Sequence, residues 1–179
     1  MEKHLPFPVS ARPWESLSEP ERDFFCFQDN YLPLHRNHAS KIGLLSSADA
    51  ARVCEWAFAT VPLGWPDTGR WFQHEEQLNI QDCWNDERRR ADVRQWLSDR
   101  HVPFATTVYL LYERDRVVET NWQMVVRYWD AFAWSVGFAM VTVDDTLQWA
   151  CGFHHEEVIV LGQQRPPHNP PMHRTGPAV

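Results

Sequence analysis

The sequence lacks the local motifs that mark the common enzyme classes. It has no glycine-rich phosphate-binding loop and no Gly-x-Ser-x-Gly nucleophile elbow. None of its four cysteines lies in a recognisable nucleophile signature. These absences argue against the common enzyme classes and leave only a rarer type open, so we lean towards a protein that is not an enzyme.

Paired cysteines and long apolar runs are also missing. No two cysteines form a C-x-x-C pair, which predicts reduced and mostly buried thiols. The longest apolar stretch, residues 131–143, is too short for a membrane span, which needs about 20 residues. The first eight residues, Met-Glu-Lys-His-Leu-Pro-Phe-Pro, contain no apolar segment of a secretory signal. We therefore expect a cytoplasmic protein that does not bind membranes.

Positive charge is scarce in most of the 179-residue chain. The formal net charge is −7, and residues 163–179 contain two arginines and no acid, so the rest carries 15 basic and 24 acidic residues. Such an acidic body repels phosphate backbones and anionic lipid surfaces, which argues against nucleic-acid and membrane binding. A protein partner, if there is one, is expected to present a basic surface. The sequence does not indicate the oligomeric state.

Proline divides the chain into three parts. Residues 1–20 contain four prolines and no periodicity, which predicts a loose N-terminal arm. Residues 163–179 contain five prolines and almost nothing apolar, which predicts a disordered tail. Residues 21–162 between them are predicted to form a single globular domain, since the length suits one domain.

Three segments have helical spacing and capping signals. Residues 46–61 begin with Ser46 and Asp49, a capping box, and repeat apolar residues on one face. Residues 85–100 have Asn85 or Asp86 as a cap and a narrow apolar stripe. Residues 121–133 follow a second capping box, Thr120 with Gln123, and place two tryptophans on one face. In this last segment the charged residues Arg127 and Asp130 are expected on the opposite face.

Four segments are predicted as strands. Residues 106–112 are β-branched and aromatic throughout, and residues 138–143 and 147–151 are joined at Asp144-Asp145, a hairpin signal. Residues 157–161 form a last strand before Gly162. Together with the three helices, this pattern predicts an α+β fold in which the helices pack on an antiparallel sheet.

The central part of the chain resembles a small family of uncharacterised bacterial proteins. The stretch that carries the resemblance is Val-Tyr-Leu-Leu-Tyr-Glu-Arg-Asp-Arg-Val-Val-Glu-Thr-Asn-Trp at residues 108–122, followed by Arg-Tyr-Trp at residues 127–129. The resemblance covers about residues 92–162, and the sequence departs from the family pattern in the strand region after Phe138 and in the proline-rich tail. Because that family has no assigned activity, the resemblance implies a fold and nothing catalytic.

Histidines and acids supply the candidate chemistry, but their spacing is weak evidence. His35 and His38 are best interpreted as two surface histidines, because no further ligands for a structural zinc are evident. His74 lacks the second histidine of the zinc-protease helix, since Leu78 stands at that position. His154 is expected in a solvated turn between strands, and Glu119 is expected at the start of a helix. Either residue could instead belong to a catalytic cleft. The sequence does not show whether His74 and His154 converge, and we expect no metal and no cofactor.

Tryptophan is the unusual component, with ten residues. Trp65 and Trp71 lie in a loop region rich in Gly and Pro, and Trp149 lies on a predicted strand. Exposed indole rings at such positions stack on sugars or anchor protein partners.

The leading expectation is therefore a non-catalytic interaction or regulatory protein, of the immunity type. One alternative is an enzyme of unfamiliar class with a histidine–carboxylate cleft, and another is a carbohydrate-binding module. The candidate binding residues are Trp65, Trp71, His74, Glu119, Trp149 and His154.

Overall fold

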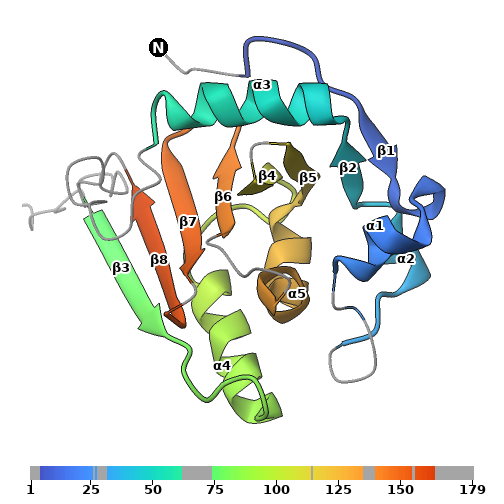
Figure 1. The fold of residues 1–179 in the computed structure, drawn as a ribbon. Helices are drawn as coiled ribbons and strands as arrows, with labels where there is room; N and C mark the ends of the chain where they lie inside the picture. Colours follow the sequence, from blue (N-terminus) through green and yellow to red (C-terminus); the bar gives the residue numbers. More distant parts are fainter. Residues whose placement is uncertain are drawn as a thin grey trace, which may run out of the picture.

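The fold is a curved eight-stranded antiparallel sheet with helices on both of its faces, in a computed structural model (Figure 1). The structure describes residues 5–25, 27, 32–61, 74–113, 115–134, 140–154 and 156–163. The strand order is β1-β2-β5-β4-β6-β7-β8-β3, which confirms the α+β class. The strands are β1 (Ala11–Pro13), β2 (Gly43–Leu45), β3 (His74–Asn79), β4 (Thr107–Glu113), β5 (Arg116–Asn121), β6 (Met140–Asp144), β7 (Trp149–His154) and β8 (Val158–Gln163).

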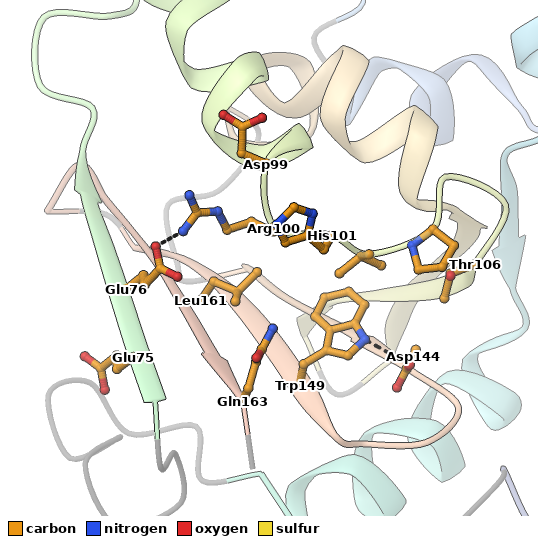
Figure 2. A pocket seen from close by; sticks show the side chains of 12 residues that line it. Glu75, Glu76, Asp99, Arg100, His101, Thr106, Asp144, Trp149, Leu161 and Gln163 are labelled. Carbon is orange, nitrogen blue, oxygen red and sulfur yellow. Dashed lines mark hydrogen bonds and ion pairs between the residues drawn. The ribbon is translucent and has the colours of Figure 1, made fainter. Parts of the chain in front are cut away.

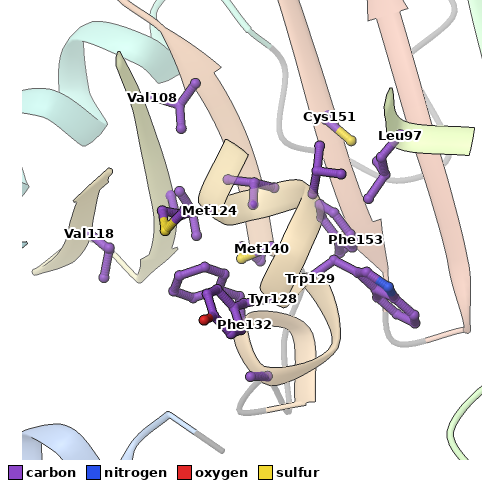
Figure 3. Packing of buried hydrophobic residues seen from close by; sticks show 14 of the residues in the cluster. Leu97, Val108, Val118, Met124, Tyr128, Trp129, Phe132, Met140, Cys151 and Phe153 are labelled. Carbon is purple, nitrogen blue, oxygen red and sulfur yellow. The ribbon is translucent and has the colours of Figure 1, made fainter. Parts of the chain in front are cut away.

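Strand alternation gives the sheet two apolar faces. One face packs on α4 (Glu87–Ser98) and α5 (Trp122–Trp134), and the sheet curves around α5 (Figure 1). Side chains of α5 lie between those of β4–β7 and Leu97 of α4 (Figure 3). The other face packs on α3 (Ser47–Phe58) near β2 and β5. The short elements η1 (Trp14–Ser16), α1 (Glu19–Asp23) and α2 (Arg36–Ala39) complete the described part.

The helix caps confirm two sequence predictions and correct a third. Ser46 Oγ accepts from Asp49 N at the start of α3, and Asp86 Oδ1 accepts from Arg88 N at the start of α4. Thr120 does not cap α5: it is a buried residue of β5 whose hydroxyl donates to the Lys41 carbonyl. Asn121 Oδ1 accepts from the Met124 amide instead.

Helix α5 is kinked at Tyr128, where φ is −118° and ψ is 25°. Ala131 N, whose partner in a straight helix would be the Arg127 carbonyl, donates to Asp130 Oδ1 at 3.0 Å. The Arg127 carbonyl accepts from Arg94 Nε at 3.3 Å. Asp130 is thus fully buried at the kink, and the expectation that it lies on the outer face is wrong.

Several segments differ from the sequence predictions. The loose arm expected over residues 1–20 contains β1, which pairs with β2, and Trp14 packs against the core. Residues 116–121 form β5, where a turn and a helix start were expected. Residues 74–79 form β3 inside an expected loop. Of the expected tail, Gln163 ends β8, and residues 164–179 lie outside the described residues.

Two predictions about cysteines and membranes can be compared with the described part of the chain. Cys54, Cys83 and Cys151 are buried there, as expected, while Cys26 lies outside it. None of the helices described is both long and apolar enough to cross a bilayer.

Candidate functional site

A pocket of about 610 Å³ opens where β3, β8 and β7 approach the loop that follows α4 (Figure 2). Its volume is in the range of small-ligand sites. The described residues that line it are Glu75, Glu76, Asp99, Arg100, His101, Val102, Pro103, Thr106, Asp144, Trp149, Leu161 and Gln163. They come from four separate parts of the chain, which only the sheet pairing brings together.

Arg100 is the buried cation of this pocket. Its guanidinium pairs with Glu76 of β3 (Figure 2). It also lies 4.3 Å from the centre of the Trp96 ring. Its Nε donates to the Trp96 carbonyl at 2.9 Å, which fixes the side chain at the end of α4. Only 12 % of the Arg100 side chain is exposed, and this burial lowers its pKa. The Arg100–Glu76 pair joins α4 to the edge strand β3.

Trp149 forms a wall of the pocket. Its indole Nε1 donates to Asp144 Oδ2 at 2.9 Å (Figure 2), and its ring packs edge-on against Trp122. Asp144 Oδ1 also accepts from Thr146 N and Leu147 N, each at 3.0 Å. Asp144 is therefore the residue that organises the β6–β7 turn, in agreement with the predicted hairpin. Trp149 is only 8 % exposed, so a small part of the ring borders the pocket, which is too little for the flat platform on which a sugar stacks.

Negative charge predominates among the described residues that line the pocket. Four of them are acidic and one is an arginine. The Glu75 carboxylate lies on the opposite face of β3, which leaves three carboxylates and one guanidinium for the pocket. Asp144 is held by the turn, and Asp99 accepts from Gln95 Nε2 at 2.8 Å. Asp99 and Glu76 are nevertheless exposed to solvent, so they can meet an incoming cationic group. The pocket therefore suits a positively charged ligand group better than an anion.

The loop from α4 to β4 forms one rim of the pocket and is hydrogen-bonded to the start of α5. His101 has φ of 59°, a left-handed conformation that costs energy in a residue other than glycine. The Phe104 and Thr106 carbonyls accept from Gln123 N and Trp122 N, both at 3.0 Å, and so satisfy the first turn of α5. Phe104 is 48 % exposed, and no other large apolar side chain in the described ranges is classed as exposed.

His74 is on β3 and His154 is on β7, and they lie beside opposite ends of strand β8, which runs between those two strands. His74 is opposite Gln163, which also pairs with Trp149, so its position is at the pocket end of the sheet. His154 is opposite Val158, five residues earlier along β8, or about 17 Å away at the usual rise per residue. The two histidines therefore do not converge.

Glu119 lies apart from both histidines, on β5. Its carboxylate accepts from the Tyr109 hydroxyl, and burial raises the pKa of Glu119. It lines a second cavity of about 340 Å³ together with Lys41 and the end of β1. Strands β4 and β6 separate it from the strand of His154. The proposed cleft of His74, Glu119 and His154 is consequently not assembled.

Other sequence candidates also have definite positions. Trp65 and Trp71 lie outside the described residues. His38, expected at the surface, contacts the fully buried Tyr128 hydroxyl through Nδ1 at 2.8 Å. No group of three metal-ligating side chains occurs in the ranges the structure describes.

Sequence reasoning missed Arg100 and Glu76, the pair at the centre of the pocket. Glu76 belongs to the His-Glu-Glu stretch considered only for zinc, and Arg100 looks like an ordinary helix-terminal cation. The 23 residues between them contain no signal that joins the two side chains, because their contact depends on the β3–β8 pairing.

No family model matches the chain, and no curated protein or solved structure matches it either. The resemblance of residues 92–162 to an uncharacterised bacterial family thus stays a prediction. The function must be argued from the site itself.

Proposed function

We propose that the chain is a non-catalytic binding protein whose pocket receives a basic side chain of a protein partner. The observation that carries the proposal is the pocket in which the carboxylates of Glu76, Asp99 and Asp144 accompany one guanidinium beside the Trp149 wall. Excess negative charge attracts a lysine or arginine, and the apolar wall packs against its methylene stem. A cytoplasmic, regulatory role of the immunity type is part of this proposal.

The state of the pocket carboxylates favours binding over catalysis. Asp144 accepts from the Thr146 and Leu147 amides and from Trp149, so it serves the turn. Glu76 is paired with Arg100. Cys151 of β7 is fully buried, and burial raises its pKa, which makes it a poor nucleophile. The described lining thus supports recognition more readily than acid–base chemistry.

The binding test uses capped peptides with a single variable residue. The probes are Ac-Gly-Ser-Gly-X-Gly-Ser-Gly-amide in which X is arginine, lysine, norleucine or glutamate, titrated while the Trp149 indole N–H is followed by NMR. The Trp149→Phe variant assigns that signal. Arginine and lysine peptides should shift the signal, norleucine should do so weakly and glutamate not at all.

Two charge variants test the site. Glu76→Gln removes one carboxylate and leaves Arg100 without its partner, so the arginine peptide should bind about fivefold more weakly, equivalent to roughly 1 kcal/mol. Glu55→Gln, an equal charge change on the distant helix α3, should leave binding unchanged. Equal binding of the norleucine and arginine peptides, or equal effects of the two variants, would rule the proposal out.

A further inference from the structure

The two edges of the sheet are built differently. Strand β1 at one edge has three residues and ends in Pro13, so it presents little backbone for pairing. Strand β3 at the other edge has six residues, contains no proline and pairs with β8 without a register shift. No strand in the described part of the chain pairs with the outer side of β3. An edge of this kind is a template for an added strand.

The hydrogen bond beyond the end of β3 shows which backbone groups point outwards. Ile80 N donates to the Glu157 carbonyl at 2.7 Å, and these residues are opposite each other in the register that pairs Asn79 with Val158. Residue 80 therefore belongs to a hydrogen-bonded pair. In an antiparallel ladder such pairs alternate with pairs whose groups point away. The backbone groups of Glu75, Gln77 and Asn79 consequently face the outer side of β3.

Side chains of β3 make this edge acidic on both faces. Glu76 points to the pocket, where it meets Arg100, while Glu75 and Gln77 lie on the opposite face and contact each other. Acidic residues directly opposite like charges destabilise strand pairing. A second copy of β3 would bring the same acids, whereas a basic segment would bring attraction.

We infer that the outer edge of β3 binds an extended, basic segment of the protein partner as an additional strand. This inference rests on the proposed function and specifies how the basic side chain reaches the pocket. Alternate residues of an added strand point to the same face as Glu76. One of them can therefore enter the pocket from the edge while the backbone pairs with Gln77 and Asn79.

The test compares Gln77→Pro with Gln77→Ala in the full chain. Proline removes the outward amide of residue 77, whereas alanine keeps that amide, and both remove the same side chain. Proline is tolerated on edge strands where its missing N–H faces outwards. Circular dichroism melting should therefore show that both variants fold. The probe is Ac-Arg-Val-Arg-Val-Arg-Val-amide, with its affinity measured by calorimetry.

The peptide should bind the wild-type chain and Gln77→Ala with similar affinity. It should bind Gln77→Pro about tenfold more weakly, because this variant loses one backbone hydrogen bond to the added strand.

Two methylated peptides give the complementary test from the ligand side. One carries N-methyl groups on the arginines and the other on the valines. Because the amides alternate in direction, only one of them should lose binding.

The possible failures are distinguishable. Equal affinity for Gln77→Pro and Gln77→Ala, or equal loss with both methylated peptides, overturns the edge inference while leaving the single-residue preference for arginine intact. If a norleucine version of the peptide binds as tightly and stays sensitive to Gln77→Pro, the edge inference holds and the proposed basic partner is wrong. A wild-type dimer in light scattering that Gln77→Pro dissociates would identify a second copy as the occupant and overturn the inference.

Discussion

Asp130 allows a stability prediction that separates its hydrogen bond from its charge. The side chain is fully buried at the kink of α5. Oδ1 accepts from Ala131 N at 3.0 Å, and Oδ2 lies 3.4 Å from Arg94 Nη2 and 3.7 Å from Arg90 Nε. Asp130→Ala removes all three contacts, whereas Asp130→Asn keeps an oxygen for the Ala131 amide and loses the charge.

The expected magnitude follows from what each variant leaves behind. Removing one member of a buried ion pair costs about 3–5 kcal/mol. Arg90 and Arg94 keep contacts with Glu87 at 2.7 and 2.8 Å, so Asp130→Ala should lose about 3 kcal/mol, at the lower end of that range. Asp130→Asn should lose about 1 kcal/mol, because the neutral amide still satisfies Ala131.

The pH dependence supplies a second measurement. Burial raises the pKa of Asp130, and the neighbouring Arg94 and Arg90 only partly oppose this. A raised folded-state pKa contributes stability that is fully present below the unfolded value of about 3.8 and is lost as the pH rises through the folded value. The wild type should therefore gain stability relative to Asp130→Asn as the pH falls from 7 towards 4.

Urea denaturation of the three proteins at neutral and mildly acidic pH measures both effects. Equal losses for Asp130→Ala and Asp130→Asn would show that the hydrogen bond to Ala131 contributes nothing. A wild-type advantage that grows with rising pH would show that the charge, and not the neutral form, is favoured at the kink.

Three further predictions concern the sheet and its rim. Gly43→Ala should lower the free energy of unfolding by about 1–2 kcal/mol, because the new Cβ would lie 2.6 Å from Ala11 Cβ. Adding Ala11→Gly to that variant should restore the lost stability in thermal melts, and a Gly43→Ala variant as stable as the wild type would contradict this packing. Trp149→Phe leaves Asp144 Oδ2 without its indole donor and should cost about 1 kcal/mol in urea unfolding, with no loss counting against that hydrogen bond. Burial and Glu119 raise the pKa of Tyr109 to about 12, so Tyr109→Phe should remove a late step from the alkaline phenolate titration and leave the earlier part unchanged.

Helices were the most predictable part of this fold because their signals are local. The predicted segments 46–61, 85–100 and 121–133 correspond to α3, α4 and α5. Capping by Ser46 and by Asp86 depends on residues two or three positions away, which the sequence displays directly. The predicted strands after residue 104 also correspond to β4, β6, β7 and β8, since β-branched and aromatic residues are concentrated there.

Strands β5 and β3 were missed because distant residues determine them. Thr120-x-x-Gln123 imitates a helix start, yet Thr120 is held in β5 by the Lys41 carbonyl, 79 positions earlier. Strand β3 is rich in polar residues and lacks strand-forming side chains, but its pairing with β8 overrides that low propensity. The pocket could not be predicted for the same reason, since Arg100 meets Glu76 only after β3 has joined the sheet.

The distribution of charge distinguishes scaffold from candidate site. Between α4 and α5, the acids Asp130 and Glu87 face the cations Arg90 and Arg94, so the ion pairs of this interior network are matched one to one. At the pocket, by contrast, the carboxylates of Glu76, Asp99 and Asp144 accompany a single guanidinium group among the described lining residues. Stability alone favours the matched arrangement, because an excess of like charges weakens a fold. The acidic excess beside β3 is therefore not explained by the needs of the fold, and it supports the proposed recognition of a cationic partner.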